Sequence, residues 1–282
     1  AMGIHAGPVT FRGIGFDGIA AGTLIAQYSG LLYALAVIFT RYRKVFTGYS
    51  ASGVFRLFRD REMKLYFKLN ADLFVRSMCI MAIYAGMTVI SARYGDMMLA
   101  VSSILVQMMM LFSYFTDGFA YAGEALTGRF VGMERPDSVR KTVRCVFAWS
   151  MGVAALFMVI YAVLGEPVLH LLTSDGEVVA ASLEFIPWLV PMPVIGCAAF
   201  TWDGIYVGAT ASRTIRDSSI WAVVAFFAAW YAGRALLSPT PDGTPEIAVH
   251  ILMAAYMMHV IVRFVYETAL YKRSILSEPF AR

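Results

Sequence analysis

The chain has 282 residues, of which 59% are hydrophobic and only 15% are charged. A soluble domain would carry about 25% charged residues, so the composition excludes a water-soluble globular protein. The formal charge of +4 comes from basic breaks between apolar runs, so it gives no indication of nucleic-acid binding. We therefore predict an all-α fold, a polytopic helical membrane protein with about seven transmembrane helices.

Apolar runs of about twenty residues recur along the chain, and each is long enough to cross roughly 30 Å of hydrocarbon as a helix. The predicted spans are 17–39, 70–92, 97–120, 140–164, 178–200, 217–237 and 247–270. The parts expected around them are an external segment at 1–16, a basic cytoplasmic linker at 40–69, a six-helix unit at 70–275 and a cytoplasmic tail at 276–282.

Basic residues predict the orientation of these spans. Lys and Arg collect in alternate breaks, at 40–68, 129–144, 210–216 and 271–282, whereas the other breaks contain almost none. The positive-inside rule places the basic breaks and the C-terminus in the cytoplasm and the N-terminus outside. We expect a multi-pass protein of the inner (cytoplasmic) membrane. The first residues lack the pattern of a signal peptide, so the chain reads as if it started within a longer protein.

Two acidic stretches share one pattern. Phe115–Phe130 reads FTDGFAYAGEALTGRF and Phe200–Thr210 reads FTWDGIYVGAT, so Phe-Thr precedes Asp-Gly in both. At 1.5 Å per helical residue, Asp117, Glu124 and Asp203 are expected near the cytoplasmic ends of their spans. A lone carboxylate facing lipid would cost several kcal/mol, so these side chains should face protein or water.

A fourth carboxylate, Asp72, begins the second span from the same side, and Arg76 follows one turn later. The four acids are therefore expected at one depth. In one interpretation they cap helices, pair with Arg76, Arg129 or Arg216, and hold the helix ends together. In the other, one or more of them bind a cation or gate a cavity.

Small residues follow the first of these acids. Close helix contact of the small-xxx-small kind is predicted at Gly118, Ala122, Ala125, Gly128 and Gly132.

The last predicted span carries a polar stripe. His259, Arg263 and Glu267 are four residues apart, so they share one helix face. A membrane-embedded histidine is a candidate for proton-linked switching, and an interhelical hydrogen bond is the structural alternative.

Pro187, Pro191 and Pro193 are too closely spaced for a straight helix in the fifth span. Broken helices in transporters commonly line cavities. The 17 methionines would suit a cavity for varied apolar ligands, or they could simply pack against lipid.

Several stretches together resemble one family. DGFAYAGEALTGRFVG, with the short basic loop after it, resembles the eighth helix of the multidrug and toxic compound extrusion (MATE) family, in its DinF-like branch. LNADLFVRSMCI is similar to the seventh helix, FTWDGIYVGATASRTIRDS to the tenth helix and its loop, and FDGIAAGTLIAQYSGLL to the sixth. The resemblance covers about residues 16–275.

The resemblance implies antiport, in which inward H⁺ or Na⁺ drives export of amphipathic or cationic compounds, with no cofactor besides the coupling ion and no metal. The family has twelve helices in two lobes, so this chain would match the sixth helix and the C-terminal lobe, and its partners would be the missing N-terminal lobe, a small-molecule substrate and the lipid bilayer. In DinF-like relatives the proton-linked carboxylate lies on the first helix, which has no counterpart here. Other branches use acids on the seventh and tenth helices, where Asp72 and Asp203 lie.

Two alternatives to efflux stay open. One is a flippase for lipid-linked oligosaccharides from the same superfamily, although such proteins line their cavity with more basic residues. The other is a truncated, non-transporting fragment or assembly partner, in which case the chain alone would not perform coupled transport. An enzyme is not expected, because the sequence shows no HExxH pattern, no GxGD-type aspartate pair and no serine nucleophile motif.

Overall fold

The computed structural model describes residues 5–6, 9–10, 16–41, 61–237 and 244–277. The chain divides into two compact units, Ala1–Leu65 and Tyr66–Arg282, which are described separately. In the first unit, β1 (His5–Ala6) pairs antiparallel with β2 (Val9–Thr10), and α1 (Phe16–Arg41) is a 26-residue apolar helix. The predicted linker at 40–69 lies mostly outside the described residues, and the predicted division into parts stays a prediction.

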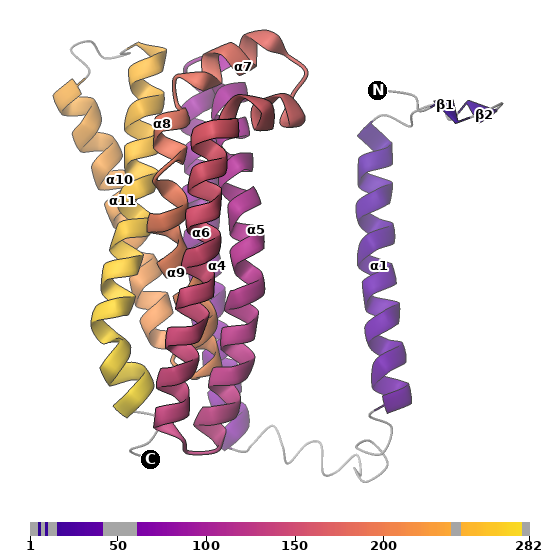
Figure 1. The fold of residues 1–282 in the computed structure, drawn as a ribbon, viewed down its shortest axis with the longest axis vertical. Helices are drawn as coiled ribbons and strands as arrows, with labels where there is room; N and C mark the ends of the chain where they lie inside the picture. The colour runs from indigo at the N-terminus through magenta and orange to yellow at the C-terminus, as the bar shows by residue number, and fades with distance from the viewer. Residues whose placement is uncertain (1–4, 7–8, 11–15, 42–60, 238–243, 278–282) are drawn as a thin grey trace. The chain divides into compact units, whose positions relative to one another are not determined.

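The second unit is a bundle of antiparallel helices (Figure 1). Its elements are α4 (Arg61–Ala92), α5 (Asp96–Gly132), α6 (Pro136–Leu172), α7 (Gly176–Leu183), α8 (Ile186–Leu189), α9 (Met192–Gly208), α10 (Ser212–Leu237), α11 (Pro245–Tyr271) and a final π-helical turn, η1 (Lys272–Ser277). Helix α7 lies at the end of the bundle opposite to the C-terminus (Figure 1). A large apolar core runs through the middle of the bundle, and its buried aromatic residues include Phe112, Tyr161, Phe226 and Tyr256.

Seven helices in the described part of the chain are long and apolar enough to cross a membrane, which confirms the predicted fold class. Several of the predicted spans differ in extent from the helices. The third was expected to end at residue 120, but α5 continues to Gly132, because no proline interrupts the chain before Pro136. The fifth was expected at 178–200, whereas the membrane-length segment is Ile186–Gly208 and Gly176–Leu183 forms the separate helix α7.

Prolines explain the breaks and the kink in this half of the bundle. Pro187 and Pro193 lie in the first turns of α8 and α9, and Pro191 caps α9. Proline has no N–H to donate and clashes with the preceding helical turn, so the broken fifth span follows as predicted. Helix α6 was expected to stop at Leu164. It is instead kinked there, ahead of Pro167, and runs on to Leu172.

Helices α5 and α9 cross at very close range, and glycines on α9 make this approach geometrically feasible. A Cβ atom added to Gly204 would lie 2.0 Å from the carbonyl oxygen of Ala120, and one added to Gly208 would lie 2.3 Å from that of Glu124. The two Asp-Gly stretches recognised in the sequence therefore pack on each other. The glycines on α5 contribute less than predicted.

Of the α5 glycines predicted to allow close contact, Gly128 does so, since its added Cβ would lie 3.3 Å from the carbonyl oxygen of Gly208. Gly118 and Gly132 do not, because nothing in the described structure lies within 4 Å of such an atom. Gly118 is on a different face of α5 from the one that meets α9, whereas Gly132 is one turn beyond Gly128 on the same face and lies past the contact with Gly208.

Candidate functional site

Four charged side chains from three helices form one buried network. Asp203 on α9 lies between two arginines: Arg263 Nη2 of α11 donates to Asp203 Oδ2 at 2.6 Å, and Arg76 of α4 donates to the same carboxylate through Nε, at 3.3 Å, and through Nη2. Arg263 is 2% exposed and Glu267, one turn further along α11, is 0% exposed. Two arginines thus balance two carboxylates, with Arg263 and Glu267 fully buried and Arg76 and Asp203 partly exposed.

Glu267 closes the network on the side of α10. Its Oε1 accepts a hydrogen bond from Ser218 Oγ at 2.7 Å and lies 3.7 Å from Arg263 Nε. The i, i+4 spacing predicted this shared face of α11. His259 begins the same stripe and is buried, with its Nδ1 2.5 Å from the carbonyl oxygen of Tyr256 in its own helix. In this structure the histidine bonds locally rather than across to another helix.

Asp72 lies in a second polar cluster. It accepts hydrogen bonds from Ser212 Oγ and from Arg216 Nη1, each at 2.7 Å, and Arg216 also pairs with Asp217. Asp72 was expected to begin the second span, but the helix starts at Arg61 and its membrane-length segment at Met63. Asp72 is therefore well inside α4, where it ties that helix to the start of α10.

Asp117 and Glu124 have no such partners. Both are half-buried on α5, and neither forms a hydrogen bond or ion pair with any residue that the structure describes. Asp117 interacts electrostatically with Asp203 and Arg76, so it is near the buried network without being bonded to it. Of the four acids expected together, Asp117 therefore lies near Asp203, whereas Asp72 belongs to a separate cluster.

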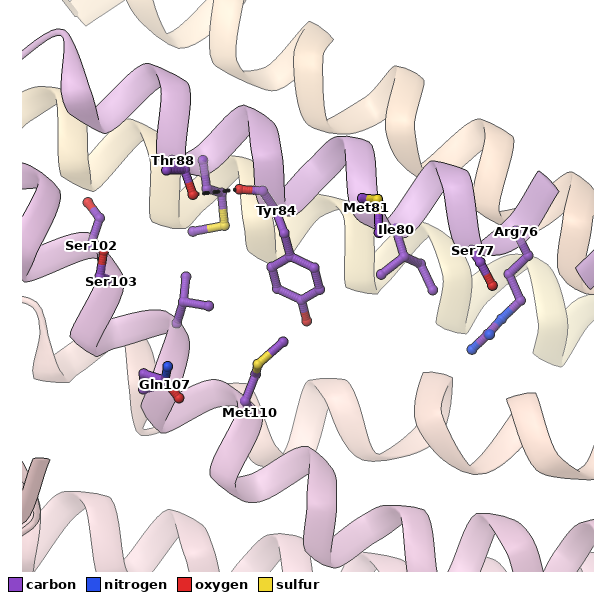
Figure 2. Close-up of a pocket in the computed structure, with 12 residues that line it drawn as sticks. Arg76, Ser77, Ile80, Met81, Tyr84, Thr88, Ser102, Ser103, Gln107 and Met110 are labelled. Carbon is purple, nitrogen blue, oxygen red and sulfur yellow. Dashed lines mark hydrogen bonds between the residues drawn. The ribbon is translucent and has the colours of Figure 1, made fainter. Parts of the chain in front are cut away.

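A pocket of about 520 Å³ opens beside the network, between α4 and α5. In Figure 2 the ring of Tyr84 reaches into the space between the two helices, with Met110 facing it from α5 and Arg76 at one end of the row of α4 side chains. The polar lining residues are Arg76, Ser77, Tyr84, Thr88, Ser102, Ser103 and Gln107, and the apolar ones are Ile80, Met81, Met87, Val106 and Met110. Arg76 is the one charged side chain in this wall, and it also belongs to the network.

The methionines are divided between two roles. Met81, Met87 and Met110 line the pocket, whereas Met108 and Met109 are buried in the core. The burial of Met108 and Met109 in the core was not predicted, and a pocket for varied apolar ligands stays a prediction.

The prolines of the broken fifth span do not line the pocket between α4 and α5. Trp188, next to Pro187, lines a separate apolar pocket of about 340 Å³ between α8, α10 and α11.

Sequence reasoning missed several polar partners. Ser212 and Ser218 were not singled out, yet each bonds a buried carboxylate. Ser212 fell in the break before the sixth predicted span, and Ser218 fell at the start of that span, 217–237. Arg216 was one of three proposed partners, and its pairing with Asp72 agrees with that proposal. Among the described residues, no group of three or more His, Cys, Asp or Glu is arranged to hold a metal ion.

A bundle of membrane-length helices that holds balanced charges beside a pocket is the architecture of a multi-pass membrane protein. A family model described as MatE matches residues 73–229, more than half of the chain. The chain belongs to this family of membrane transporters, which confirms the resemblance seen in the sequence.

Two relatives illustrate the relationship. The chain is 30% identical over 274 residues to the DNA damage-inducible protein F of Escherichia coli (strain K12), an alignment that covers 96% of this chain and 54% of the relative. It is 24% identical over 200 residues to Protein DETOXIFICATION 44, chloroplastic, of Arabidopsis thaliana, covering 70% of this chain and 36% of that protein. The chain thus spans about half the length, or less, of these curated relatives.

Proposed function

We propose that this chain supplies the C-terminal lobe of an efflux transporter, in which inward movement of H⁺ or Na⁺ drives export of amphipathic compounds. The pocket between α4 and α5 would be this lobe's share of the substrate cavity. The observation that carries the proposal is the double role of Arg76, which lines the pocket and pairs with buried Asp203. A change of charge near Asp203 would therefore act on Arg76, which is part of the pocket wall.

The lining fits an amphipathic substrate. Tyr84, Met81 and Met110 offer adaptable apolar surfaces, while Ser103 and Gln107 offer hydrogen-bonding groups. Because Asp203 pairs with Arg76, the wall carries little net charge and can accept the apolar part of a neutral or cationic compound. A flippase for pyrophosphate-linked lipids would need more cations than the one in this wall, so efflux is the better-supported reading.

Within this lobe we propose different roles for the acids. Asp203 is held by two arginines and serves as a latch between α4, α9 and α11. Asp117 is unbonded, half-buried and within electrostatic reach of both Asp203 and Arg76, so it is the carboxylate where a coupling ion would act. Glu124 and His259 remain secondary candidates, because neither touches the pocket or the Arg76–Asp203 pair in the contacts described.

Efflux is tested in a chimera in which residues 1–282 replace the matching half of the E. coli relative, expressed in cells without their own multidrug exporters. The chimera should lower accumulation of a fluorescent amphipathic dye, and a protonophore or sodium ionophore should abolish the effect. Asp117→Asn should reduce efflux at least tenfold while leaving the amount of protein in the membrane unchanged, because the amide keeps the shape of the side chain and removes its charge.

Two controls interpret the result. Asp203→Asn should lower membrane abundance together with efflux, since it leaves two arginines short of a counter-charge. Asp137→Asn alters an exposed acid at the start of α6 and should change neither quantity. A chimera that is abundant in the membrane yet exports no dye would contradict the proposed function, and full efflux by Asp117→Asn would contradict the role of that residue.

The orientation is a separate proposal, with the basic breaks and the C-terminus in the cytoplasm. In a version whose three native cysteines are replaced, single cysteines at Ser174 and Thr244 should react with a membrane-impermeant thiol reagent in intact cells. One at Ser138 should react only after the cells are opened. Ser174 lies just after the end of α6, and Thr244 lies just before the start of α11. Ser138 lies in the first turn of α6. The reverse labelling pattern would overturn the orientation.

A further inference from the structure

A second pocket, separate from the one beside the charge network, lies where α6 begins and α11 ends. It has a volume of about 770 Å³, and its walls come from α6, α9, α11 and η1. Three of its lining residues are the cations Arg140, Arg144 and Lys272, and no lining residue is acidic. We call it the basic pocket. In Figure 1 this end of the bundle is the one near the C-terminus.

The three cations converge for reasons of helix geometry. Arg140 and Arg144 are four residues apart, so they stand on one face of α6, and Lys272 is the first residue of η1, directly after α11. The one ion pair here joins Arg140 to the exposed Asp137 at 4.0 Å, a weak surface contact. Arg144 and Lys272 form no ion pair within the described parts of the chain. The pocket therefore presents positive charge that its own residues do not neutralise.

The floor of the basic pocket is aromatic and held in place. The ring centroids of Trp202 and Phe147 are 4.7 Å apart, and those of Trp202 and Tyr271 are 5.1 Å apart. Trp202 Nε1 also donates to Thr268 Oγ1 at 2.9 Å. Phe264, 37% exposed, forms the outer wall. A ligand that fits this surface has an anionic head and an apolar body that leaves past Phe264.

We infer that the basic pocket binds the headgroup phosphate of an anionic phospholipid. The cations lie at the ends of membrane-length helices, where headgroups are found, and basic pockets between transmembrane helices recognise such headgroups through their charge. Arg144 and Lys272 contact the phosphate oxygens, Trp202 and Tyr271 cover the glycerol region, and the acyl chains run along Phe264. A free phosphate ion would use only the first of these contacts.

The test is competition between phosphatidylglycerol and phosphatidylcholine for the purified 282-residue chain in detergent, with bound lipids counted by native mass spectrometry. The chain should retain phosphatidylglycerol over phosphatidylcholine by more than about tenfold. Each basic side chain near a headgroup favours anionic lipid by about fivefold, so Arg144→Gln with Lys272→Gln should reduce the preference by tenfold or more, to near parity. Millimolar inorganic phosphate should not displace the bound lipid.

A matched pair of variants controls for net charge. Lys141→Gln with Arg213→Gln removes two exposed cations, one in the second turn of α6 and one in the first turn of α10. Both lie outside the basic pocket, so the lipid preference should stay intact. Thermal unfolding of both double variants should match the parent, since none of the four side chains is buried. Equal loss of preference in the two pairs, no preference in the parent, or displacement of the lipid by inorganic phosphate would each overturn the inference.

Discussion

Gly204→Ala should destabilise the bundle by about 3 kcal/mol or more, although it adds only a methyl group. The added Cβ would lie 2.0 Å from the carbonyl oxygen of Ala120, 2.5 Å from its carbonyl carbon and 2.9 Å from its Cα. These atoms belong to the backbone of α5, so no side-chain rotation can relieve the clash. Helices α5 and α9 would have to move apart, and the packing along their whole contact would loosen.

The matched control is Gly118→Ala on α5. Nothing in the described structure lies within 4 Å of the added methyl group, and alanine favours a helix over glycine by about 1 kcal/mol. Thermal unfolding in detergent, followed by circular dichroism or by size-exclusion chromatography after heating, should show the two variants shifting in opposite directions. Equal midpoints for Gly204→Ala and the parent would contradict the close crossing of α5 and α9.

Arg263→Met should be the second large effect, with a loss of about 3–5 kcal/mol. The substitution removes a hydrogen bond to Asp203 and the counter-charge of Glu267, and it leaves a carboxylate that is 0% exposed with only Ser218 as a hydrogen-bond donor. Breaking a buried ion pair by removing one partner is costly, because the other charge stays buried without compensation.

A double variant separates this cost from a loss of packing. Arg263→Met combined with Glu267→Met removes both charges of the pair on α11 and should recover at least half of the stability lost in the single variant, because no uncompensated carboxylate remains on that helix. Unfolding midpoints of the parent, the two single variants and the double variant complete the thermodynamic cycle. If the double variant lost as much stability as the two single variants together, or more, the charge balance would not be the source of the effect.

The sequence predicted the helical class and the polar stripe of α11 because both depend on short-range regularities. Long apolar runs report a hydrocarbon environment, and the spacing of Arg263 and Glu267 reports one helix face. The physical cost of a lone buried charge also predicted that Asp203 and Asp72 would face protein or water, and pairing with arginine was one of the two interpretations left open. That cost did not predict that Asp203 would pair with Arg263, because the choice of partner depends on how α9 and α11 are rotated about their axes.

The unknown rotation of each helix about its axis also explains the errors in the predicted glycine contacts. On α5, glycines occur on more than one face, and the sequence does not say which face meets α9, so Gly118 was chosen wrongly and the role of Gly204 on the partner helix was missed. The shift of the fifth span has a different cause: the apolar run preceding Pro187 has the composition of a membrane segment, but it folds as the short helix α7. Proline positions were informative because their effect on the backbone is local.

The order in which the ribosome adds the charged residues of the buried network bears on how this protein enters a membrane. Arg76 is made first, Asp203 follows 127 residues later, and Arg263 comes 60 residues after that. When α9 leaves the insertion machinery, its aspartate therefore already has a partner waiting in α4. Helix α11 brings Arg263 and Glu267 together on one face, so it can partition as a pair of opposite charges. The arrangement spares α9 and α11 from carrying an unpaired charge of this network into lipid, and the final contacts among the three helices complete a neutralisation that began during translation.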